Sequence, residues 1–197
     1  MTAYDERQKY FKDKLKYYTL LSKKNEEYAS TLKRIKNDLW ECIITQRPEV
    51  YYFINRFNDQ YEDDNKIGSL FKAWINYLPF VEFHIELKKE LILDRNKSND
   101  CEVYNWGLSS KKEYIDAFTL PINEKVENLT SEQSVYTIID AGEKGTFSYK
   151  LLDKALKFIK DHEFSLSGDV TGNLLARVHE PDGYHRYIEL WLPIKKC

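Results

Sequence analysis

Near its C-terminus the chain places an acidic side chain between two aromatic rings. Residues 187–194 (YIELWLPI) alternate as a strand does, with an aliphatic residue at every second position. Glu189 lies on the other face, between Tyr187 and Trp191. Rings offer flat apolar area and a negative face, and the carboxylate supplies a countercharge. This spacing predicts a site for an organic cation, although a solvent-facing Glu189 paired with Lys or Arg remains an equal alternative.

Aromatic residues on other predicted elements would complete a pocket around Glu189. The chain holds 15 Tyr, 10 Phe and 4 Trp, 15% of its residues and well above the usual share. Trp74 lies in the inward stripe of a predicted helix and is expected in the core. The rings expected to join Glu189, Tyr187 and Trp191 in binding a ligand are Tyr51, Phe53, Tyr77, Tyr104 and Trp106.

Signals for catalysis and for metal binding are weak. The sequence has no nucleophile elbow, no phosphate-binding loop and no pair of histidines at helical metal spacing. Glu82, His84 and Glu86 alternate on one strand face, where a solvated surface is favoured over a metal site. We therefore expect no catalytic residue, no metal and no cofactor.

A long helix is expected to precede these elements. Residues 1–47 contain neither Gly nor Pro and carry 11 basic and 7 acidic side chains, against 19 and 25 in residues 48–197. A heptad frame predicts a coiled-coil homodimer through residues 11–43, although packing of the helix on its own domain stays open. Its seam positions are Phe11, Lys14, Tyr18, Leu21, Asn25, Tyr28, Leu32, Ile35, Leu39 and Cys42.

Residues 48–197 are expected to form an α+β domain in which the order strand–helix–strand–strand occurs twice. Two such half-sheets commonly join across a pseudo-twofold axis with a central cleft between them. Residues 88–100 are expected to be a loop or an irregular hairpin, residues 121–133 a polar connector, and residues 180–183 (EPDG) a hairpin turn. The elements of the first unit are expected at 48–57, 66–78, 80–87 and 102–109, and those of the second at 134–140, 147–162, 167–178 and 187–194.

Composition limits the class of partner and the compartment. The formal net charge of −2 does not favour binding to nucleic acid or to a membrane surface. No apolar run approaches a membrane span, and the first residues lack the apolar segment of a signal peptide. Cys42, Cys101 and Cys197 are odd in number and without metal-ligand spacing, which is typical of free thiols in a cytoplasmic protein.

The second half of the chain resembles the GyrI-like effector-binding domain. That family tends to end in a strand with a Glu, an aliphatic residue, two further residues and Pro-Ile, matched by Glu189, Leu190 and Pro193-Ile194. It also has a Gly shortly before its second helix, matched by Gly142 or Gly145. A long heptad helix before such a domain is the arrangement of MerR-family multidrug-sensing regulators.

The resemblance implies a dimeric regulator whose domain binds bulky lipophilic, often cationic, effectors. Such regulators contact operator DNA through an N-terminal winged helix-turn-helix, which residues 1–10 cannot supply, so we expect either the C-terminal part of a regulator or a stand-alone relative. Relatives often carry an acidic residue where Thr171, Gly172 and Asn173 stand here, which leaves the cation preference to Glu189. The resemblance also implies two alternatives: a hydrolase with Glu189 as general base and Tyr187 as orienting group, or a protein-binding module.

Overall fold

The computed structural model describes residues 2–57, 60–94, 104–143 and 147–197. It is an α+β structure with a long N-terminal helix and a ten-stranded antiparallel sheet within these residues. The chain divides into two compact units, Met1–Asn37 and Asp38–Cys197. None of the helices in the described ranges combines the length and the apolar character that a membrane span requires.

The first helix, α1 (Ala3–Asp38), is shorter than its expected range. Thr2 caps its start: the Thr2 hydroxyl accepts the backbone N–H of Asp5 at 3.3 Å, and the Asp5 carboxylate accepts the backbone N–H of Thr2 at 2.8 Å. It stops before Trp40, which takes a left-handed φ of 68° and donates its backbone N–H to Ile138 O at 2.8 Å. The next residues, β-branched at three of four positions, form strand β1 (Ile43–Gln46), so the expectation of one helix to residue 47 is wrong at its end.

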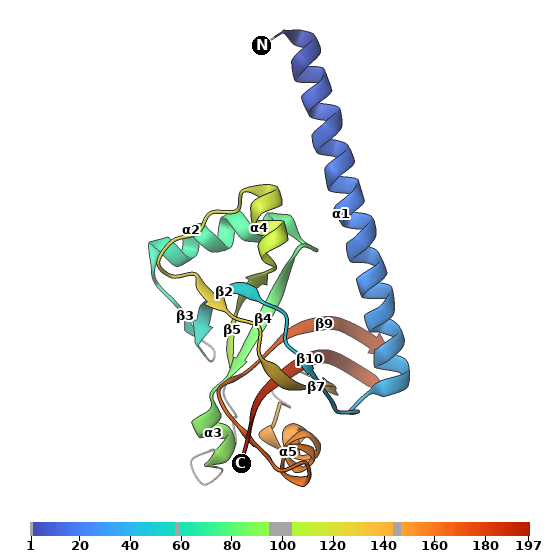
Figure 1. Cartoon of the computed structure of the whole chain (residues 1–197), viewed down its shortest axis with the longest axis vertical. Helices are drawn as coiled ribbons and strands as arrows, with labels where there is room; N and C mark the ends of the chain where they lie inside the picture. Colours follow the sequence, from blue (N-terminus) through green and yellow to red (C-terminus); the bar gives the residue numbers. More distant parts are fainter. Residues whose placement is uncertain (1, 58–59, 95–103, 144–146) are drawn as a thin grey trace. The chain divides into compact units, whose positions relative to one another are not determined.

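The remaining strands complete one sheet with the order β1-β7-β10-β9-β4-β5-β2-β3, while β6 pairs with β2 and β8 with β10. Within this order, β2-β5-β4 forms one set of three strands and β7-β10-β9 forms another. The two sets meet where β4 pairs with β9 (Figure 1). The bounds are β2 (Val50–Phe57), β3 (Gln60–Tyr61), β4 (Val81–Leu87), β5 (Asn105–Ser110), β6 (Glu127–Leu129), β7 (Gln133–Asp140), β8 (Phe164–Leu166), β9 (Val170–Glu180) and β10 (Gly183–Lys196).

Short helices pack against the sheet in two groups (Figure 1). One core lies under α2 (Asn65–Trp74), the 3-10 helix η1 (Ile75–Tyr77) and α4 (Lys112–Phe118), and includes Leu70, Trp74 and Ile115. The other lies under the 3-10 helix η3 (Tyr149–Leu152) and α5 (Asp153–Asp161), and includes Leu152 and Ile159. Both cores use the same face of the sheet, because their strand residues keep the same alternation along β4.

Most expected elements of the sheet domain are present, with shifted ends. The expected helix 66–78 begins one residue earlier and finishes as η1, and the helix expected at 147–162 begins as η3. The sequence reading missed α4, and it missed α3 (Lys89–Leu93) inside the expected loop 88–100, because helices this short show little periodicity. Residues 95–100 of that loop, residues 102–103 of the expected strand, Cys101 and Gly145 lie outside the described residues, while Cys42 and Cys197 are free thiols.

Candidate functional site

The centre of the sheet presents a row of polar side chains across three strands. Glu189 on β10 lies opposite Asn173 on β9, and Asn173 lies opposite His84 on β4. Directly opposed residues of antiparallel strands point to the same face. The alternate residues of β10, among them Ile188 and Leu190, point to the helix-covered face and belong to its core, as the sequence predicts. We call the other side, which carries Glu189, the polar face.

Hydrogen bonds hold Glu189 in a fixed position. Its Oε2 accepts the hydroxyl of Tyr136 at 3.1 Å, and its Oε1 accepts Nδ2 of Asn173 at 3.0 Å. The same Nδ2 donates to Oε2 of Glu82 at 3.2 Å, and Oδ1 of Asn173 accepts the hydroxyl of Ser109 at 2.9 Å. One amide therefore lies between two carboxylates at the junction of β4 and β9.

Trp191 and Tyr187 flank Glu189 on the polar face, as the alternation predicts. The Trp191 ring packs edge-on against Tyr136, with ring centroids 4.5 Å apart. The Tyr187 ring stacks on His185, with centroids 5.9 Å apart and planes at 7°. Sequence reasoning missed Tyr136, which comes from β7 and reaches Glu189 only through the strand register. The ring that bonds the carboxylate is thus Tyr136 rather than Tyr187.

The five other aromatic residues expected around Glu189 lie elsewhere. On β2, Tyr51 and Phe53 lie opposite Ser110 and Leu108, and Phe53 is buried against Trp74 with centroids 5.2 Å apart. The face of β2 that carries Tyr51 and Phe53 was expected to line the pocket, but it packs on the core instead. The remaining three also pack on the cores, Tyr77 against Phe118, and Tyr104 and Trp106 against each other and the η3–α5 core.

The face of β4 that carries Glu82, His84 and Glu86 is largely buried, so the expected solvated surface is wrong. Glu86 accepts Nδ2 of Asn105 at 2.8 Å and pairs with Lys88 at 2.8 Å. Burial by itself would lower the pKa of Lys88. Hydrogen bonds and ion pairs with Glu86 and Asp169 outweigh this effect and raise the pKa to about 12. His84 is 2% exposed, and its ring lies 4.6 Å from that of Tyr52.

His84 is held neutral by burial, which lowers its pKa to about 3, with Asn173 opposing the shift. Between about pH 3 and 6.5 the unfolded chain therefore binds a proton at this residue that the folded chain does not. The free energy of unfolding is expected to fall as pH drops below about 6.5, by up to about 1.4 kcal/mol per pH unit from this group. Urea unfolding of wild type and His84→Phe at about pH 5 to 7 measures this difference in slope.

The matched control for this pH dependence is His162→Gln, because His162 lies in an exposed position at the end of α5. We expect that variant to keep the wild-type slope. Equal slopes for wild type and His84→Phe would show that the folded protein protonates His84 as readily as the unfolded chain does, contrary to the expectation.

Among the described residues, a cluster of three side chains that could bind a metal ion lies at the β9–β10 turn and not on the polar face. It comprises Glu180, Asp182 and His185, whose ligand atoms lie within 4.8 Å of one another. The imidazole of His185 already contacts Asp140 at 2.6 Å and Asp182 at 3.2 Å. These two carboxylates raise the pKa of His185, so the cluster forms a satisfied ionic network at the hairpin.

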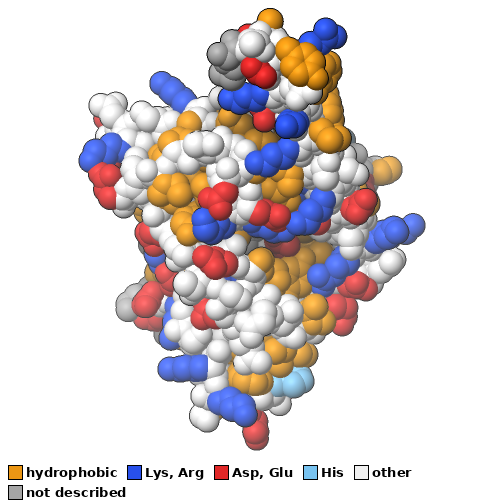
Figure 2. Space-filling view, turned by 45° about the horizontal axis from the view of Figure 1, so that its top comes forward, with side chains coloured by type: hydrophobic (Ala, Val, Ile, Leu, Met, Phe, Trp, Pro, Cys, Tyr) orange, Lys and Arg blue, Asp and Glu red, His pale blue; other side chains and the backbone are white. Residues whose placement is uncertain are grey.

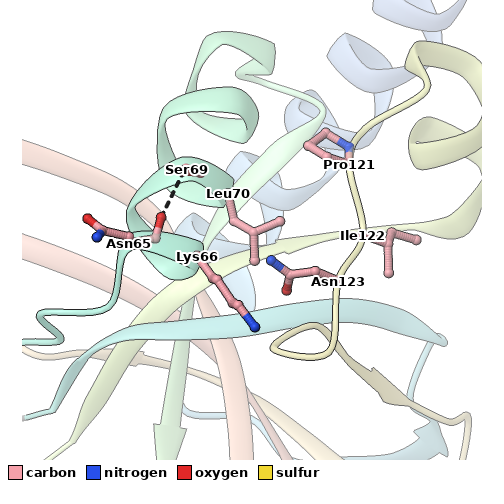
Figure 3. Close-up of a pocket in the computed structure, with 7 residues that line it drawn as sticks. All are labelled: Asn65, Lys66, Ser69, Leu70, Pro121, Ile122 and Asn123. Atoms are coloured by element: carbon pink, nitrogen blue, oxygen red, sulfur yellow. Dashed lines mark hydrogen bonds between the residues drawn. The ribbon is translucent and has the colours of Figure 1, made fainter.

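A surface hollow of about 330 Å³ lies between α2 and the segment that follows α4 (Figure 3). Leu70 and Ile122 give it an apolar lining, and Lys66 lies at its edge, paired with Glu124. None of the predicted site residues lines it. The lining residues are Asn65, Lys66, Ser69, Leu70, Pro121, Ile122 and Asn123.

No family model matches this chain, and no curated protein matches it. Solved structures do. The EcmrR C-terminal domain is 9% identical with a TM-score of 0.47, covering 79% of this chain and 98% of that one. A hydrolase from Listeria innocua is 10% identical with a TM-score of 0.47, covering 85% and 98%. EcmrR in an EcmrR–DNA complex is 12% identical with a TM-score of 0.43, covering 98% and 69%.

These neighbours include two structures of EcmrR, one of them in a complex with DNA. They also include a protein described as a hydrolase. At identities near 10% and TM-scores below 0.5 they assign neither a ligand nor a site residue to this chain.

Proposed function

We propose that this chain is the effector-binding and dimerisation part of a MerR-like transcriptional regulator, and that it senses a bulky lipophilic cation at the polar face. The observation that carries the proposal is Glu189, fixed by Tyr136 and Asn173 beside the Trp191 ring in the middle of the sheet. A partly buried carboxylate with rings beside it has the chemistry that an aromatic or quaternary cation requires.

The strengths of these contacts support a ligand of moderate affinity. A desolvated cation over an aromatic ring gains about 2 kcal/mol, and the nearby carboxylate adds a charge-assisted contact. Glu82 lies on the other side of the Asn173 amide and adds negative charge to the same face. A cation bound here would therefore meet two carboxylates and the Tyr136–Trp191 ring pair.

The strand order supports a duplicated architecture for this binding domain. β2, β5 and β4 occupy the same relative positions as β7, β10 and β9, with α2 and α5 in corresponding places along the chain. Glu189 and Asn173 lie beside the junction of the two halves. A ligand that binds both halves would alter their relative position, and in a dimeric regulator that change would reach separate DNA-binding domains.

Charge on the surface fits a domain that does not itself bind DNA. On the face shown in Figure 2, acidic and basic side chains are interspersed and hydrophobic side chains form separate patches between them.

The ligand proposal predicts that tetraphenylphosphonium raises the melting temperature of the full chain by several degrees at saturating concentration, because a ligand that binds the folded state stabilises it. Glu189→Gln should remove most of this gain, since the amide keeps the shape but not the charge. The matched control is Glu124→Gln, an exposed carboxylate paired with Lys66. A gain as large in Glu189→Gln as in wild type, or no gain with any aromatic cation, would contradict the proposal.

We propose in addition that α1 forms a homodimer. Phe11, Tyr18 and Leu32 occupy one heptad position, and each is more than half exposed. A helix of 36 residues with such a stripe gains stability when a partner buries it. The helix ends before Leu39 and Cys42, so the proposed seam is shorter than the expected 11–43.

Sedimentation of the full chain is expected to give a dimer. The double substitution Phe11→Glu and Leu32→Glu should give a monomer, because it introduces charges into the seam. The control pair Lys12→Glu and Lys33→Glu changes neighbouring residues outside the seam and should leave the dimer intact. A monomeric wild-type chain at micromolar concentration would remove this proposal.

One contact favours a second function, hydrolysis of a small molecule. The carboxylate of Glu189 accepts the Tyr136 hydroxyl, so a general base and an orienting phenol are already adjacent. The family resemblance implies the orienting role for Tyr187, but the Tyr187 ring is stacked on His185. Mass spectrometry of candidate ligands after incubation distinguishes the two functions, because a sensor releases them unchanged.

A further inference from the structure

Two buried polar side chains on the polar face lack hydrogen-bond partners among the described residues. Thr171 is 3% exposed, and its Oγ1 has no partner. His84 is 2% exposed, and neither ring nitrogen makes a hydrogen bond of acceptable geometry, although the Asn173 side chain is close to the ring. Thr171 lies opposite Trp191, and His84 is two strands from Glu189 along the row through Asn173.

These unsatisfied groups are unusual because they are costly. Leaving a buried donor or acceptor unpaired costs about 1–3 kcal/mol, and nine in ten such groups in proteins are paired. Neighbouring side chains obey the rule: Ser109 and Asn173 bond each other at 2.9 Å on the same face. On the opposite face, the side chain of the buried Thr137 lies beside the Cys42 thiol. His84 and Thr171 therefore share a face with Glu189, while Ser167 Oγ and Arg47 Nε are further buried atoms without a partner among the described residues.

We propose that His84 and Thr171 belong to the binding site around Glu189, and that its ligand is a cation that also carries an uncharged hydrogen-bonding group such as a hydroxyl or an amide. This inference rests on the function proposed above. It changes the ligand class from a purely lipophilic cation to a bifunctional one. The ligand group supplies the hydrogen bonds that the free protein lacks.

The register sets the size of this ligand. Adjacent strands lie about 4.8 Å apart, so β10 and β4 are separated by about 10 Å. The cationic centre lies at Glu189 and the polar group near His84 or Thr171, within that span. Because burial keeps His84 neutral at physiological pH, one ring nitrogen donates and the other accepts. A group that can both donate and accept, as a hydroxyl does, fits both side chains.

The test uses two probes that differ by one hydroxyl: tetraphenylphosphonium and (4-hydroxyphenyl)triphenylphosphonium. Calorimetric titration of the full chain should show the hydroxylated probe binding at least about fivefold tighter, the size expected of one net hydrogen bond. Thr171→Val and His84→Phe each remove an orphan and keep the side-chain shape. Both variants should bring the affinity ratio towards one. Thr137→Val removes a hydroxyl from the opposite face and should keep the wild-type ratio.

A second readout needs no ligand. Thr171→Val should leave the melting temperature equal or raise it, because the hydroxyl makes no bond, whereas Thr137→Val should lower it. A loss of stability in Thr171→Val as large as in Thr137→Val would show that the hydroxyl is already satisfied and would overturn the inference.

The outcomes separate this inference from the proposed function. If both probes bind equally to wild type, or if the preference persists in both variants, the inference is wrong, while dependence on Glu189 still supports a cation sensor. If neither probe binds, or if both bind equally well to Glu189→Gln, the proposed function fails and the inference fails with it.

Discussion

Gly172→Ala is expected to destabilise the sheet domain by about 3 kcal/mol, the upper part of the range for forced overpacking. A Cβ at Gly172 would lie 1.9 Å from the carbonyl oxygen of Glu189 and 2.9 Å from Cδ2 of Leu190. The oxygen belongs to the backbone of β10, so it cannot rotate away. β9 and β10 would have to separate at the point where Glu189 bonds Asn173.

Urea unfolding followed by circular dichroism measures this loss as a lower midpoint. The matched control is Gly68→Ala in α2, where an added Cβ meets no atom within 4 Å. Alanine is favoured over glycine inside a helix by about 1 kcal/mol, so this control should raise the midpoint. A wild-type midpoint for Gly172→Ala would mean that β9 and β10 are not held as closely as the structure has them.

The sequence alone shows which face of β10 is buried, because the two faces of this strand carry different kinds of residue. Ile188 and Leu190 are aliphatic and Glu189 is charged, so a period of two leaves one assignment. On β2 the same rule fails: Tyr51, Tyr52 and Phe53 are all aromatic, and alternation alone does not say which set faces the core. The register with β5 decides it and buries Phe53 under the helices.

The partners of Glu189 lay beyond sequence reasoning for a related reason. Tyr136 and Asn173 come from β7 and β9, and each reaches Glu189 only because β10 is hydrogen-bonded between these two strands. Neither residue stands in a motif. The orphaned hydroxyl of Thr171 is likewise a property of packing, because threonine in a strand is ordinary. Local pattern located the carboxylate, and non-local pairing determined its surroundings.

Arg186→Met is expected to lower the free energy of unfolding by about 3 kcal/mol, because several buried acceptors would lose their donor at once. Arg186 is 4% exposed. Its Nε donates to Gly142 O at 2.7 Å, and its terminal nitrogens donate to Ala141 O at 3.1 Å and to the Tyr104 hydroxyl at 3.3 Å. These bonds tie β10 to the turn that follows β7. Methionine keeps the apolar stem and replaces none of them.

The hairpin offers a matched control for Arg186, because Arg177 lies directly opposite on β9 and is exposed. Arg177→Met should change the urea midpoint by no more than an ordinary surface substitution, about 0.5 kcal/mol. Arg186→Lys should be nearly as damaging as Arg186→Met, since one ammonium group cannot reproduce a planar fork that reaches carbonyls in different directions. If Arg186→Lys kept the wild-type midpoint, charge alone would stabilise the turn, and the geometry of the guanidinium would not be the reason that Arg186 is buried there.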